Sequence, residues 1–145
     1  MNLLNALEWQ QVTILSLALI VAKQSSRPSA RNVDIDDNAF RLCSGFGGGM
    51  GHAADVCGAL VGCVMVISTL VGRNHPAEKP LKEIYPISKE FHDRFAEAFG
   101  STKCSDLMPY EFDTREHLKN CLKLTNKVAQ LLATFLLEKG LVKEE

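Results

Sequence analysis

The sequence has no excess of basic residues. It contains 16 lysines and arginines against 17 aspartates and glutamates, which gives a formal net charge of −1. A protein that holds nucleic acid or an anionic membrane surface needs clustered positive charge to neutralise phosphates. The charge balance therefore predicts that nucleic acid is not a partner of this protein.

The sequence also has no apolar run long enough to cross a membrane. The run Val12–Ala22 is about half of the roughly 20 residues that a transmembrane helix requires. A secretory signal carries positive charge before its apolar run, whereas the first lysine here, Lys23, follows the run. These features predict a buried core helix, no membrane span and a cytoplasmic location.

No CxxC motif is present, which argues against a thioredoxin-type dithiol, a zinc ribbon and covalently bound haem. The sequence nevertheless contains five cysteines, an odd number that cannot all pair within one chain. In a reducing compartment cysteines normally stay thiols. Clustered thiols in such a protein indicate redox work or metal binding.

The remaining patterns are helical, since apolar residues recur at helical spacing and no segment alternates as a strand does. We expect an all-α fold, a single domain over residues 1–145 built as a bundle of about five helices. The N-caps, apolar faces and terminating glycines predict helices from Asn5 to about Lys23, a short one capped by Asp34 or Asp36, and then Ala54–Val71, Ser88–Phe99 and one from Thr114 to Gly140.

A glycine-rich loop precedes the central apolar helix. Five of the seven residues in Gly45–Gly51 are glycine, a density that predicts a sharp turn or a close approach to other atoms. The loop fits the dinucleotide fingerprint only through its weaker alanine variant, and helix rather than strand is expected before it. We interpret it as a turn that positions Cys57, with a small-molecule or nucleotide site as a less favoured alternative.

Cys57 is the first candidate reactive thiol. It is expected in the opening turn of the helix after the glycine loop, where unpaired N–H groups and the helix dipole favour thiolate. A small buried core residue is the alternative interpretation. Cys63 points to another face of the same helix and is expected in the core, whereas Cys43 comes near Cys57 if the loop doubles back.

Two further thiols follow in the C-terminal half. Cys104 is expected in a short irregular segment after Gly100, and Cys121 in the last helix beside its apolar stripe. His117 lies four residues before Cys121 and therefore on the same helix face. An imidazole nitrogen and a thiolate at this spacing can share a metal ion.

Four segments in this order resemble a known family. They are SGFGGGMG (44–51), CGALVG (57–62), FGSTKC (99–104) and CLKL (121–124). Together they are similar to the C_GCAxxG_C_C family, bacterial and archaeal candidate redox-active proteins named for a lone cysteine, a CGAxxG motif and two further cysteines. The resemblance covers about Phe40 to Leu137.

The resemblance implies a helical protein with redox-active or metal-binding cysteines and identifies Cys57, Cys104 and Cys121 with three of the four signature cysteines. The family's first cysteine belongs in the first helix, near Gln10–Val12, where this chain has none. Either the original chemistry has been lost or another residue replaces that ligand. The candidates for replacement are Cys43, Cys63, His52 and His117.

The leading hypothesis is therefore a redox-active or metal-binding protein whose reaction the sequence does not specify. In the redox version Cys57 is the nucleophile, Cys104 or Cys121 resolves it, and a redox protein is the partner. In the metal version the three thiolates and a further ligand hold zinc or an iron–sulfur centre. The alternative is a non-catalytic interaction module with vestigial cysteines, which forms a homodimer through the face of Gly58 and Gly62 and through the very apolar first helix.

Overall fold

The computed structural model describes residues 41–142 of the chain. This part of the protein is helical and contains no β-strand. Its elements, in order, are α3 (Gly47–Met50), α4 (Gly58–Val71), the 3-10 helix η1 (Leu81–Glu83), α5 (Tyr85–Phe99), α6 (Cys104–Leu107) and α7 (Arg115–Glu138). The expected all-α class is confirmed.

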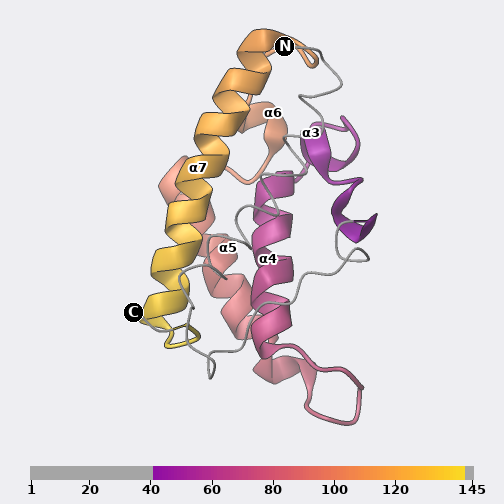
Figure 1. Ribbon diagram of the computed structural model, residues 1–145, viewed down its shortest axis with the longest axis vertical. Helices are drawn as coiled ribbons and strands as arrows, with labels where there is room; N and C mark the ends of the chain where they lie inside the picture. Colours follow the sequence, from indigo (N-terminus) through magenta and orange to yellow (C-terminus); the bar gives the residue numbers. More distant parts are fainter. Residues whose placement is uncertain (1–40, 143–145) are drawn as a thin grey trace.

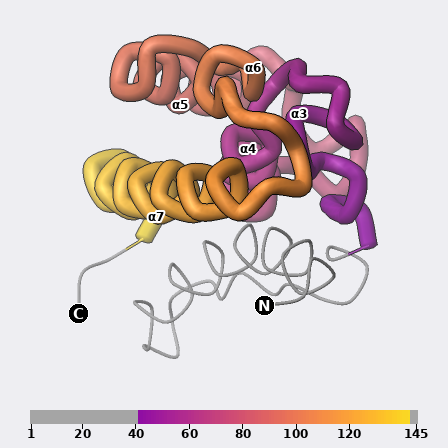
Figure 2. Tube along the Cα trace, turned by 90° about the horizontal axis from the view of Figure 1, so that it is seen from above, coloured from indigo at the N-terminus to yellow at the C-terminus, as the bar shows by residue number. Residues whose placement is uncertain are grey.

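Three long helices enclose the core. α4 and α7 run in the same direction, from the top to the bottom of Figure 1. α5 runs in the opposite direction and leads to α6. Each of the three contacts the other two, so that they surround one interior when seen from above (Figure 2). The largest completely buried side chains are Phe91, Phe95, Phe135, Ile67, Leu132, Leu136 and Val128.

α4 is apolar on almost every side, which is why it occupies the centre. It ends at Val71, as expected, but begins at Gly58 rather than at Ala54. The expected start was wrong because Ala54 has a left-handed backbone (φ 57) and Val56 forms an antiparallel bridge with Lys103. The residues before α4 are thus held by pairing with another part of the chain.

α5 also differs at its start. The expected cap was Ser88, but the helix begins at Tyr85 with Pro86 in its first turn, a position where proline's missing N–H costs nothing. Phe91 and Phe95 are completely buried, as their spacing predicts. Gly100 ends the helix in a left-handed conformation (φ 83).

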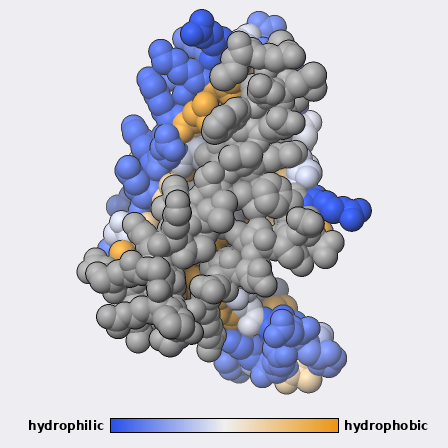
Figure 3. All heavy atoms as spheres, in the orientation of Figure 1, coloured by the Kyte–Doolittle hydropathy of each residue, from blue (hydrophilic) through white to orange (hydrophobic). Residues whose placement is uncertain are grey.

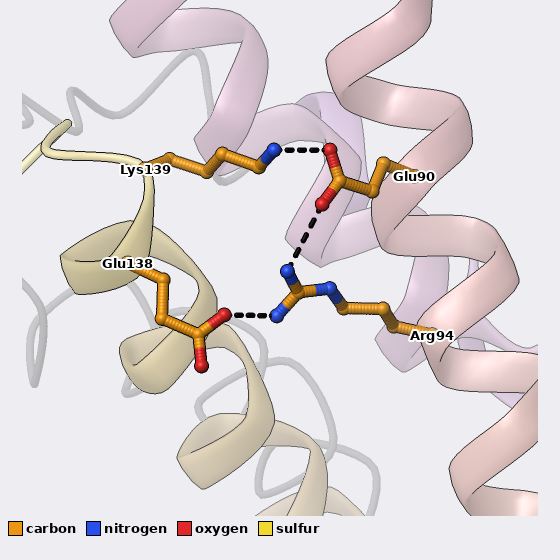
Figure 4. Close-up of polar contacts among 4 residues, drawn as sticks. All are labelled: Glu90, Arg94, Glu138 and Lys139. Carbon is orange, nitrogen blue, oxygen red and sulfur yellow. Dashed lines mark hydrogen bonds and ion pairs between the residues drawn. The ribbon is translucent and has the colours of Figure 1, made fainter.

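α7 begins where the sequence predicts, because the side chain of Thr114 accepts a hydrogen bond from the N–H of His117. Near its other end, charged side chains connect it to α5 (Figure 4). Arg94 pairs with Glu90 on its own helix and with Glu138 on α7, and Lys139 pairs with Glu90. These ion pairs are partly exposed, so each contributes little to the stability of the fold. Their main effect is on how the two helices are aligned.

On the face that Figure 3 shows, hydrophilic residues cover the upper part of α7 and the connection between α4 and η1. Among residues 41–142, none of the helices has the length and apolar content that crossing a bilayer demands. The helix expected from Asn5 to Lys23 lies outside the described residues, and so does the run Val12–Ala22. Of the short helix expected after Asp34 or Asp36, the structure describes only residues 41–43, which are helical.

Candidate functional site

The glycine loop contains the short element α3 and forms a left-handed turn at the upper end of the bundle. Gly48, Gly49, Met50, Gly51 and His52 all have positive φ values, between 62 and 69. An L-residue in this conformation costs about 1–2 kcal/mol, but glycine adopts it freely. The glycine density therefore allows a turn that most sequences cannot form.

Two of the glycines are required because other atoms lie against them. A Cβ on Gly49 would lie 2.6 Å from the Cβ of Cys104 and 2.7 Å from the backbone nitrogen of Asp55. A Cβ on Gly58 would overlap the carbonyl of Phe46. The loop is thus packed against the backbone around both Cys57 and Cys104, as expected of a turn that positions Cys57.

Backbone pairing brings Cys57 and Cys104 to one side of an isolated antiparallel bridge. The N–H of Cys57 donates to the carbonyl of Thr102 at 2.8 Å, and the N–H of Cys104 donates to the carbonyl of Asp55 at 2.6 Å. Along each of two paired extended segments, successive side chains point to opposite faces. Since Val56 and Lys103 are directly opposed, Cys57 and Cys104 both project to the other face, as diagonal neighbours.

The third signature cysteine reaches the same place from α7. A pocket at this end of the bundle is lined by Cys57, Cys104, Cys121 and His117, with Gly47, Gly48, Gly49, Gly58, Ala59, Leu107, Met108, Leu124 and Thr125 completing the wall. About 40 Å³ of it is open to water-sized molecules, which is room for roughly three. Three thiols far apart in the sequence therefore share one small pocket.

Cys57 is the N-cap of α4 rather than a residue of its first turn. Burial raises its pKa, the backbone N–H groups of Leu60 and Ala59 lower it by less, and the nearby Cys121 raises it further. The expectation that the helix end makes Cys57 a thiolate was therefore wrong. Desolvation outweighs the helix terminus because the thiol is only 7% exposed.

Cys104 is the first residue of the one-turn helix α6, a segment expected to be irregular. Burial raises the pKa of its thiol to about 11, and the negative charges that Cys57 and Cys121 would carry contribute in that order. Because each thiolate disfavours the next, the pocket does not hold several negative charges at neutral pH.

The four residues considered as replacements for the missing cysteine lie in different places. His117 is buried and lines the pocket. Cys63 is completely buried in the main core, as expected, whereas Cys43 packs in a separate cluster with Phe46 and Met65. The ring of His52 stacks on Phe112, with centroids 4.4 Å apart. The positions Gln10–Val12 lie outside the described residues.

Within residues 41–142, no group of three or more histidine, cysteine, aspartate or glutamate side chains is arranged to hold a metal ion. Sequence reasoning did not anticipate that Thr125 and Met108 would help to line the pocket. Thr125 follows Cys121 by one helical turn, so the helical repeat alone could have placed it on the same face.

Replacing Gly49 should damage the pocket's scaffold. We expect Gly49→Ala to lower the free energy of unfolding by about 2–4 kcal/mol, because the methyl group meets Cys104 and Asp55 while the backbone keeps a positive φ. Gly100 also has a positive φ, but a Cβ there would meet no other atom. Gly100→Ala should therefore lower the free energy of unfolding by about 1 kcal/mol. Gly45→Ala, with neither problem, should change stability by less than about 0.5 kcal/mol. Equal urea midpoints for all three variants would contradict this packing.

The raised pKa of Cys104 also predicts a loss of stability in alkali. Folding raises this pKa from 9.0 to about 11, so the folded protein retains a proton that the unfolded chain releases, and stability falls as pH rises through this range. We expect the urea midpoint of the wild type to fall more steeply between about pH 8 and pH 11 than that of Cys104→Ser. Parallel curves would show that the folded protein does not perturb this thiol.

Comparison with known proteins identifies a family that is named for its pattern of cysteines. The model of the family described as "Putative redox-active protein (C_GCAxxG_C_C)" matches residues 23–135, a range that contains all five cysteines. A protein of Archaeoglobus fulgidus described as "Uncharacterized protein" is 24% identical over 110 residues, which cover 70% of this chain and 73% of that protein. No solved structure matches the chain.

Proposed function

Because the chain belongs to the C_GCAxxG_C_C family, whose description is "Putative redox-active protein", we propose that it is a thiol–disulfide redox protein with Cys57, Cys104 and Cys121 as its reactive group. The observation that carries this proposal is the single pocket that all three cysteines line. Reversible disulfide formation needs sulfur atoms gathered in this way from distant parts of the chain.

The proposed reaction is exchange with a disulfide, for which a redox protein is the partner. One pocket thiolate attacks a sulfur of the partner's disulfide, forming a mixed disulfide and releasing one partner thiolate. A second pocket thiolate attacks the mixed disulfide and releases the other. Two thiols of this protein thereby become one disulfide, while the partner gains two electrons and takes up the two protons as two thiols.

The electrostatics of the pocket favour donation of electrons. A couple is strongly oxidising when the protein stabilises its reduced form as a thiolate. Here burial raises the pKa of both Cys57 and Cys104, so the reduced form gains no such stabilisation at neutral pH. The disulfide is then comparatively favoured, which suits a protein that passes electrons to a partner.

The alternative, a dimerisation module, has less support than the redox function. Gly58, half of the face expected to meet a second chain, lies against the backbone of Phe46 in its own chain. Gly62, the other half, is buried. This packing explains a glycine at position 58 without a second subunit.

Mild oxidation of the reduced protein should consume thiols in a pair. We expect the thiols titrated under denaturing conditions to fall by two after diamide treatment, and reduction to restore them, because the proposed reaction joins two of the three thiols that line the pocket.

The matched controls separate this pocket from the other cysteines. The variant Cys57→Ser/Cys104→Ser/Cys121→Ser should lose no pair, whereas Cys43→Ser should lose a pair as the wild type does, since Cys43 packs in a separate cluster. A triple variant that still loses two thiols within one chain would overturn the proposed function.

A further inference from the structure

Cys121 differs from the two other pocket thiols in its access to solvent. The side chains of Cys57 and Cys104 are 7% and 6% exposed, whereas Cys121 is partly exposed and also lines the pocket. A thiol must approach an incoming disulfide sulfur directly to attack it. Access therefore favours Cys121 over the two buried thiols as the first to react.

His117 lies one helical turn before Cys121 on α7 and lines the same pocket. Residues at this spacing are neighbours on a helix surface, with Cβ atoms about 5–6 Å apart. An imidazole and a thiol can meet across that distance. The helix thus places a proton acceptor beside the most accessible thiol.

The surroundings of His117 fix which ring nitrogen accepts a proton. Its Nδ1 lies 3.4 Å from the carbonyl oxygen of Tyr110. Because a carbonyl oxygen only accepts, Nδ1 must be the donor, and the neutral ring keeps Nε2 as its acceptor. The ring of Phe112 packs against the imidazole at a centroid distance of 4.9 Å. Phe112 thus holds the ring in place, and the contact with Tyr110 favours the tautomer that leaves Nε2 as the acceptor.

We propose that His117 accepts the proton of Cys121, and that Cys121 is the thiol that attacks the partner's disulfide. This inference rests on the proposed function and assigns its first step. The thiol proton moves to Nε2, and the Cys121 sulfur bonds to one sulfur of the partner while the other leaves as a thiolate. The imidazolium then gives its proton to that thiolate. Cys57 or Cys104 next displaces the second partner sulfur from Cys121, and its own proton passes to that sulfur.

The charges around the pocket agree with this order. The titratable groups that line the pocket with His117 are Cys121 on its own helix, Cys57 at the start of α4 and Cys104 on α6. The ring of His52 lies on the other side of Phe112. Among the residues that line the pocket, His117 is the one that can become positive. Proton transfer from Cys121 therefore forms an ion pair without adding net charge to a buried site.

The test is the rate at which iodoacetamide labels each cysteine of the reduced protein at neutral pH, followed by mass spectrometry. We expect Cys121 to be labelled first. His117→Ala should slow it about tenfold or more, since a positioned base contributes roughly 10²–10⁴-fold to reactions it assists. Added imidazole should restore part of the rate. His92→Ala, which removes an exposed histidine on α5, should leave the rate unchanged.

Cys63 reports on the fold in the same experiment, because it is completely buried and is labelled only when the core opens. If His117→Ala exposes Cys63, the labelling rate of Cys121 is compared between the wild type and His117→Gln instead. Faster labelling of Cys57 or Cys104 than of Cys121 in the wild type would overturn the inference, as would an unchanged Cys121 rate in the folded variant. Either result would leave the paired loss of thiols on oxidation intact, so the two proposals fail separately.

Discussion

The backbone pairing between residues 54–57 and 102–105 is the constraint on which the rest of the site depends. Two of its hydrogen bonds are made by the N–H groups of Cys57 and Cys104 themselves, so the chain positions both thiols through their own main chain. Gly49 closes over this pairing with no side chain to interfere. The left-handed glycine turn, the late start of α4 and the single turn of α6 all follow from accommodating this contact.

Burial and helix ends compete at the pocket, and burial prevails. A cysteine at a helix N-terminus is often activated by N–H groups, and Cys57 has such groups at Ala59 and Leu60. Yet the thiol is enclosed by the glycine turn and by α7, so removal of water disfavours its charge more than the helix end favours it. The raised pKa values of Cys57 and Cys104 are the reason for proposing that His117 supplies a base to the pocket.

The sequence predicted features that depend on local chemistry. Thr114 capping α7, Gly100 ending α5 and the buried Phe91 and Phe95 follow from side-chain preferences and helical spacing, and the structure has all of them. The start of α4 was wrong because a bridge to residue 103 overrides the helical tendency of Ala54–Cys57. Long-range pairing of this kind has no signature in either segment alone, and neither does the desolvation that reverses the expected pKa of Cys57.

The candidate thiols were chosen from their motifs, but their shared pocket could not be derived from spacing, since three separate segments meet there. The proposed chemistry depends on Cys57, Cys104 and Cys121 facing one another across this pocket. The most direct measurement is peptide mapping of the disulfide that forms when the reduced protein is mildly oxidised. We expect a linkage between two of these three residues within one chain. A linkage that involves Cys43 or Cys63, or that joins two chains, would contradict that expectation.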